Sequence, residues 1–136
     1  YEPIESCLKR IGKEGQVQST GLLSRYTGGV PFHPVQLLEG SRHLVALDTN
    51  FGLLFFDIYG NFIRPYPMSD CRFLAASGDI YWLLSEEGLQ AISASMYERL
   101  FSIPLPQPAV KALLPWGEEM LLLTEEGRLY RYQFQF

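Results

Sequence analysis

The side chains best able to do chemistry are two histidines and two aspartates, and their spacing favours structural roles. His33 and His43 lie ten residues apart without a third histidine, so a metal site built on them would need carboxylates from distant parts of the chain. Asp48 and Asp57 lie nine residues apart, and paired carboxylates act as general acid and base only where the surroundings raise one pKa. Each aspartate stands near a turn glycine, where a carboxylate commonly accepts backbone N–H bonds. We therefore predict turn-stabilising aspartates and no metal site.

Sequence signatures of enzymes and cofactor sites are absent. The chain has no Gly-x-Ser-x-Gly, no P-loop, no EF-hand loop and no sialidase-type Asp-box, Ser-x-Asp-x-Gly-x-x-Thr-Trp. Cys7 and Cys71 form no Cys-x-x-Cys pair and have no histidine at metal-ligand spacing, so we expect two buried, reduced thiols. The sequence thus predicts no catalytic residue, no cofactor and a protein that is not an enzyme.

The composition predicts a folded chain with one domain. The 136 residues are 47% hydrophobic and 14% aromatic, which argues against disorder and suits a strand-rich protein. The net charge of −4, without a run of Lys or Arg, gives no basis for binding nucleic acid or anionic lipid. The apolar runs, such as residues 120–123, are far shorter than the roughly 20 residues that span a bilayer. We expect no nucleic-acid partner and no membrane insertion.

A repeat of short apolar strands and polar turns organises the sequence. The turn glycines Gly52, Gly88 and Gly127 each lie between two apolar strands, at gaps of 36 and 39 residues. A four-stranded propeller blade repeats at roughly 40 residues. Helical periodicity is nearly absent, and the best candidate for a helix is the short segment 93–100. This recurrence predicts an all-β chain.

The strands around each glycine predict a four-stranded antiparallel meander. Proline clusters at 65–67 and 104–108 suit the end of an outermost strand, because proline cannot donate to a β-ladder. The second strand of each repeat is apolar on both faces, as expected where blades stack face to face. Its three copies are residues 43–47, 80–84 and 120–123. We predict a partial β-propeller, while the alternative, a β-sandwich, leaves the recurrence of the whole pattern unexplained.

The repeat boundaries predict one partial propeller over residues 1–136. Its ranges are 1–30 for strands of an incomplete blade, 31–67 and 68–108 for two blades, and 109–136 for an incomplete blade. Propellers typically close with four to eight blades, and an open arc leaves strand edges and an apolar blade face in water. We therefore expect a partner that covers them: missing blades from the same precursor, a second copy, or another protein.

The segment 52–62, Gly-Leu-Leu-Phe-Phe-Asp-Ile-Tyr-Gly-Asn-Phe, resembles the blades of NHL-type and related six-bladed propellers through its Asp-x-x-Gly turn. More narrowly, the chain from Leu8 to Tyr132 resembles the C-terminal half of a family of uncharacterised bacterial β-propeller proteins whose blades carry Gly-φ-φ-φ-Phe-Asp-x-φ-Gly. The resemblance implies a missing N-terminal half, a removed signal peptide and a location in the periplasm or cell envelope. It supplies no function, and because the other two repeats lack the Phe-Asp pair, no role of Asp57 transfers to them.

Propellers commonly bind ligands at the funnel where their innermost strands converge, which singles out five residues. Polar residues of the innermost strands are expected to point toward that channel, with an aromatic and a histidine near its mouths. Arg and Trp are also enriched at binding hot spots. The candidate binding residues are Gln36, Arg72, Lys111, Trp116 and His33.

These expectations lead to a non-catalytic binding or scaffolding module of a bacterial envelope protein, acting through protein–protein association. One alternative is a fragment of a propeller enzyme, a hydrolase or lyase, whose catalytic residues lie in missing blades. The other is a carbohydrate- or peptide-binding propeller.

Overall fold

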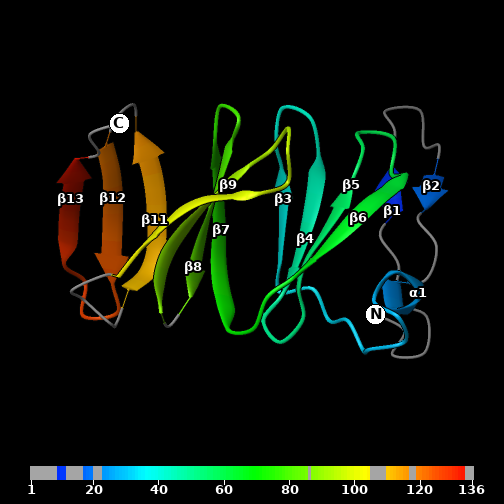
Figure 1. The fold of residues 1–136 in the computed structure, drawn as a ribbon, viewed down its shortest axis with the longest axis horizontal. Helices are drawn as coiled ribbons and strands as arrows, with labels where there is room; N and C mark the ends of the chain where they lie inside the picture. The colour runs from blue at the N-terminus through cyan, green and yellow to red at the C-terminus, as the bar shows by residue number, and fades with distance from the viewer. Residues whose placement is uncertain are drawn as a thin grey trace. The chain divides into compact units, whose positions relative to one another are not determined.

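A computed structural model describes residues 9–11, 17–19, 23–85, 87–104, 110–116 and 119–133. Within these ranges the chain consists of short strands and one helical turn (Figure 1). The elements are β1 (Lys9–Ile11), β2 (Val17–Ser19), α1 (Leu23–Tyr26), β3 (Gln36–Glu39), β4 (Leu44–Asp48), β5 (Gly52–Phe56), β6 (Phe62–Pro67), β7 (Cys71–Ser77), β8 (Ile80–Ser85), β9 (Gly88–Ser93), β10 (Arg99–Ile103), β11 (Val110–Trp116), β12 (Glu119–Thr124) and β13 (Leu129–Gln133).

The strands form meander sheets in which every neighbouring pair is antiparallel. Two sheets have four strands, β3-β4-β5-β6 and β7-β8-β9-β10, and the described part of the chain adds the three-stranded β11-β12-β13 and the two-stranded β1-β2. This confirms the all-β class and the predicted meander. The described strands of the three larger sheets lie inside the ranges predicted for blades, although the domain division itself stays a prediction.

Two local elements differ from the sequence-based expectation. The helix candidate at 93–100 is wrong: Ser93 ends β9, and the chain turns and enters β10 at Arg99. The turn is closed by Ser93, whose N–H donates to the Glu98 carbonyl at 2.9 Å. Conversely, α1 was not predicted, because its four residues are too few to show helical periodicity.

The chain divides into two compact units, Tyr1–Ser69 and Asp70–Phe136. In the first unit, one face of sheet β3–β6 is covered by the segment that contains α1. Leu23 and Phe32 of that segment are buried in a cluster with three residues of the sheet, Ala46, Leu54 and Phe56. Aromatic contacts extend this packing, with the Tyr26 ring stacked on that of Phe62 at 4.2 Å between centroids.

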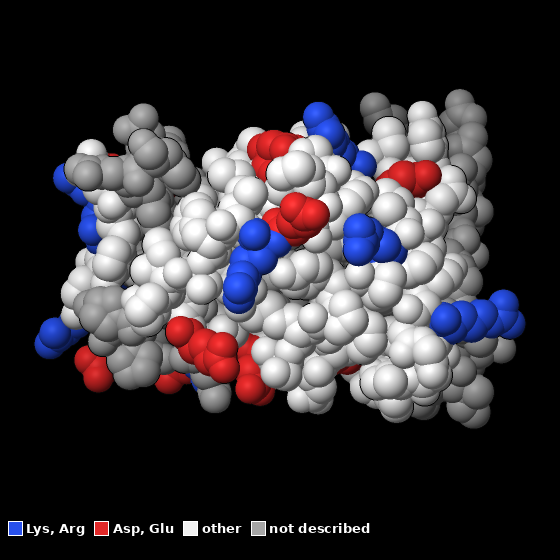
Figure 2. Space-filling model, in the orientation of Figure 1, with Lys and Arg blue, Asp and Glu red and all other residues white. Residues whose placement is uncertain are grey.

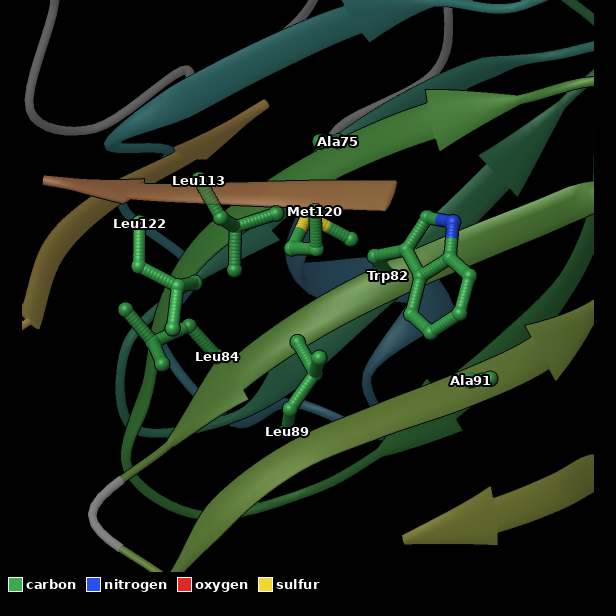
Figure 3. Packing of buried hydrophobic residues seen from close by; sticks show 8 residues of the cluster. All are labelled: Ala75, Trp82, Leu84, Leu89, Ala91, Leu113, Met120 and Leu122. Atoms are coloured by element: carbon green, nitrogen blue, oxygen red, sulfur yellow. The ribbon is translucent and has the colours of Figure 1, made fainter. Parts of the chain in front are cut away.

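In the second unit, two sheets pack face to face. Figure 3 shows Leu113, Met120 and Leu122 of sheet β11–β13 directed toward side chains of sheet β7–β10. The sheet β7–β10 contributes Ala75, Trp82, Leu84, Leu89 and Ala91 to this cluster, and all eight side chains are buried. This is the stacking that the apolar second strands predicted.

The three turn glycines aligned from the sequence are not equivalent in the structure. Gly52 pairs with Asp48 and Gly88 with Ser85, so each begins the third strand of its sheet. A Cβ atom at Gly52 or Gly88 would collide with the backbone where the fourth strand ends, at Tyr66 and Met68 or at Ile103 and Pro104. In the third sheet the corresponding position is Arg128, whose carbonyl accepts from the Thr124 N–H, while Gly127 lies in the turn with open space beside it.

Candidate functional site

The carboxylate of Asp48 is a buried structural anchor. Its Oδ1 accepts from the N–H groups of Asn50 at 2.7 Å and Phe51 at 2.9 Å, and its Oδ2 accepts from the N–H of His33 at 2.7 Å. Only 4% of Asp48 is exposed. The side chain therefore holds the β4–β5 turn and ties the segment before β3 to it, which confirms the predicted role.

Asp57 holds the β5–β6 turn in the same manner. Its Oδ1 accepts from the N–H groups of Tyr59 at 2.9 Å and Asn61 at 2.8 Å, and its Oδ2 accepts from the Asn61 side-chain amide at 2.9 Å. These bonds, the one from the Asn61 side chain first, lower the pKa of Asp57 below its ordinary value of 3.8. A general acid needs a raised pKa, so the environment of Asp57 suits a turn rather than acid catalysis.

A buried polar residue ends the second strand of all three larger sheets, a regularity that the sequence reading missed. Ser85 and Thr124 occupy the position of Asp48, and they are 7% and 6% exposed. The Ser85 hydroxyl donates to the Gly88 carbonyl at 3.4 Å, and the Thr124 hydroxyl accepts from the Arg128 N–H at 3.1 Å. The signal was present as a polar residue three to five positions before each third strand, but the three residue types differ.

The candidate binding residues Arg72 and Lys111 occupy equivalent positions. Each is the extra residue of a β-bulge near the start of the first strand, because the register of β7 shifts between Cys71 and Phe73 and that of β11 between Val110 and Ala112. Both side chains are exposed, and β7 and β11 contact each other. A β-bulge changes the direction of the side chain at the extra residue. Of the five candidate binding residues, Arg72 and Lys111 are therefore the two that occupy equivalent positions in the sheets of the second unit.

The other candidates are placed less directly. In the first unit, Gln36 begins β3 and is half-buried, and His33 is exposed while its backbone N–H binds Asp48. The side chain of Trp116 lies outside the part of the chain that the structure describes. Convergence of the five residues on one channel stays a prediction.

Neither histidine nor cysteine chemistry gathers into a cluster in the described ranges. No group of three or more His, Cys, Asp or Glu there is arranged to hold a metal ion. His43 is buried, with its ring edge-on to Phe55 at 5.5 Å between centroids. Cys71 is a buried, reduced thiol, and burial raises its pKa to about 12. Cys7 lies outside the described residues.

The most distinctive surface of the second unit is an apolar sheet face. Strand pairing places Leu114 beside Leu121, and Leu123 beside Leu129, on the side of sheet β11–β13 opposite to the buried cluster. We call these four residues the leucine face. Leu114 is 53% exposed, Leu123 37% and Leu129 66%, and Leu121 is half-buried.

Charged groups do not suggest a polyanionic partner. On the face drawn in Figure 2, the described Lys and Arg side chains form no broad patch and much of the surface is uncharged. Among the described residues, no helix combines the length and the hydropathy needed to cross a membrane.

Comparison with known proteins finds solved structures with a similar fold but no matching protein family. No protein-family model and no curated protein sequence matches the chain. Among solved structures, PorZ, an essential bacterial surface component of the type-IX secretion system of Porphyromonas gingivalis, matches 93% of this chain with a TM-score of 0.71 and 18% identity. A virginiamycin B lyase from Staphylococcus aureus matches 99% of it with a TM-score of 0.60 and 16% identity.

The chain spans only part of these two proteins, 18% of PorZ and 51% of the lyase. By contrast, it spans 87% of the computationally designed Ika4 protein, with a TM-score of 0.63 and 13% identity. Identities this low show the fold alone. PorZ and the lyase are propellers, so together with the meander sheets and their face-to-face packing they show that this chain is a partial β-propeller.

Proposed function

We propose that the chain is a non-catalytic binding or scaffolding module of a bacterial envelope protein and that it acts by associating with another protein surface. The observation that carries the proposal is the leucine face, where Leu114 and Leu129 are more than half exposed on one side of a sheet. Contiguous exposed apolar side chains on a soluble fold mark interaction surfaces, because covering them removes apolar area from water.

The polar groups of the chain support an architectural role. The two aspartates that sequence reasoning singled out have their carboxylates engaged by backbone N–H groups of turns. Carboxylates used in this way stabilise the local geometry of turns. The envelope location rests on the resemblance of the chain from Leu8 to Tyr132 to a family of bacterial β-propeller proteins, and it is consistent with PorZ being a bacterial surface component.

An enzymatic role is the second candidate, favoured by the similarity to virginiamycin B lyase. In that case the catalytic residues would lie in blades outside this chain. The cations Arg72 and Lys111, at equivalent bulge positions, would be the contribution of this chain to a central site. Loss of catalytic activity in the full protein on changing both cations to Gln, with unchanged association, would favour this candidate.

Site-specific photo-crosslinking in cells that make the protein tests the association proposal. A photoreactive residue replaces Leu129, and a matched control replaces Tyr59, which is 64% exposed in the first unit. We expect a polypeptide adduct from position 129 in clear excess over position 59. No polypeptide adduct at 129, or equal yields from both positions, would contradict the proposal, and a glycan adduct would support the carbohydrate-binding alternative.

A further inference from the structure

The register of the second unit identifies which positions of the two sheets correspond. The turn residues Ser85 and Thr124 have the same place in their sheets, and the next pairs are Leu84 with Leu89 and Leu123 with Leu129. Counting pairs from these turns superimposes one sheet on the other. In this alignment Leu114, Leu121, Leu123, Leu129 and Arg131 take the places of Ala75, Trp82, Leu84, Leu89 and Ala91.

The same face of the two sheets is covered in one and open in the other. On sheet β7–β10 these positions form the buried cluster, with Leu84 2% and Leu89 1% exposed. On sheet β11–β13 their counterparts Leu123 and Leu129 are 37% and 66% exposed. The leucine face is thus the counterpart of the face with which sheet β7–β10 packs against sheet β11–β13. Its side chains are of the apolar type that such packing uses.

The charges on this face balance one another. Arg131 and Glu119 lie on the same side of the sheet as the leucines, with Arg131 Nε 3.5 Å from Glu119 Oε1. A face that carried a single sign of charge would repel its own copy, whereas one cation and one anion beside four leucines make a self-complementary surface.

Two other sheet faces are covered within their own units. One face of β3–β6 is covered by the α1 segment, and one face of β11–β13 by the sheet β7–β10. In the described part of the second unit, the leucine face is by contrast an exposed apolar face, and a second copy would present the same face.

We propose that a second copy of this chain packs on the leucine face through its own leucine face, in a two-fold symmetric dimer. The proposal rests on the proposed function, association with a protein surface, and names the partner and the residues. Two sheets then bury their leucines against each other, and the Arg131 and Glu119 groups of each copy meet those of the other.

Sedimentation equilibrium on the purified chain tests the dimer. We expect self-association, weakened about tenfold or more by Leu129→Glu, because a carboxylate would be buried among leucines. Leu37→Glu is the matched control, since Leu37 is 52% exposed in the first unit. Equal weakening by both substitutions, or a wild-type chain that stays monomeric over the accessible concentrations, would overturn the proposal; circular dichroism checks that each variant is folded.

A charge-swap experiment gives a readout independent of any folding defect in the leucine variant. Arg131→Glu makes the face wholly acidic and Glu119→Arg makes it wholly basic, so each variant alone should dimerise more weakly than wild type. Mixing the two should restore dimers, because opposite charges then meet across the interface. A mixture no more associated than either variant alone would count against the symmetric dimer.

The two proposals fail in different ways. A monomeric wild-type chain that still gives photo-adducts with a different protein from position 129 would refute the second copy while leaving association intact. A monomeric chain without any polypeptide adduct from that position would refute both.

Discussion

Sheets β3–β6 and β7–β10 have the same topology but hold their corresponding turns with different chemistry. Between β5 and β6, the carboxylate of Asp57 accepts from N–H groups two and four residues later. Between β9 and β10, Ser93 takes that place: its hydroxyl accepts from the Met96 N–H at 3.2 Å and bonds to the Ser95 hydroxyl at 3.1 Å. The carboxylate here comes from another hairpin, because Ser95 donates to Asp79 at 2.8 Å.

The comparison shows how one blade geometry tolerates sequence divergence. In the first turn Gly60 adopts φ +89°, whereas in the second Tyr97 adopts φ +56° despite its side chain. The local Asp-x-x-Gly motif is thus replaced by a serine pair and an aspartate that is 16 residues from its partner in sequence. A search for the motif finds the first turn and passes over the second.

The largest expected effect is the difference in lost stability between a substitution at Gly88 and one at Gly127. Valine at Gly88 would place its Cβ against the backbone of Ile103 and Pro104, so we expect a loss of about 4 kcal/mol or more of unfolding free energy. At Gly127, Ala meets open space and is opposed only by φ +85°, which costs about 1 kcal/mol. Urea denaturation of the two variants measures both; similar losses would show that the fourth strand does not constrain the start of the third.

A smaller difference is expected between the residues that end the second strands. Asp48→Ala leaves three backbone N–H groups without their carboxylate, so we expect a loss of about 3 kcal/mol. Ser85→Ala removes one long hydroxyl bond, at 3.4 Å, and should cost about 1 kcal/mol. The same urea experiment applies, and a larger loss from Ser85→Ala would contradict the anchoring role of Asp48.

The smallest effect is a pH dependence confined to the first of the two turns. Because the folded pKa of Asp57 is lowered, its contribution is fully present above its ordinary pKa of 3.8 and is lost as pH falls through the folded value. We expect the melting temperature of wild type to fall more steeply than that of Asp57→Asn on acidification below about pH 4. Ser93→Ala, which changes no titratable group, should shift stability without changing that slope. Parallel acid profiles of wild type and Asp57→Asn would argue against the linkage.

Much of the architecture could be predicted because it depends on local pattern. Apolar second strands predicted β4, β8 and β12 to within one or two residues, and the role of Asp48 followed from its place beside a turn. The alignment of Gly127 failed for a specific reason: in the third sheet the position of Gly52 and Gly88 is held by Arg128, one residue later. The position of a turn glycine in the sequence does not show which residue pairs with the end of the second strand.

The sequence by itself determined the strand repeat, the meander order and the turn role of the aspartates, because alternation, turn residues and strand length are local properties. Only the tertiary structure decided which strand faces are covered. Leu84 and Leu123 occupy the same place in their sheets and are the same residue type, yet one is 2% exposed and the other 37%. Burial depends on which sheet packs opposite, and that is a property of the assembled chain that no short segment of sequence contains.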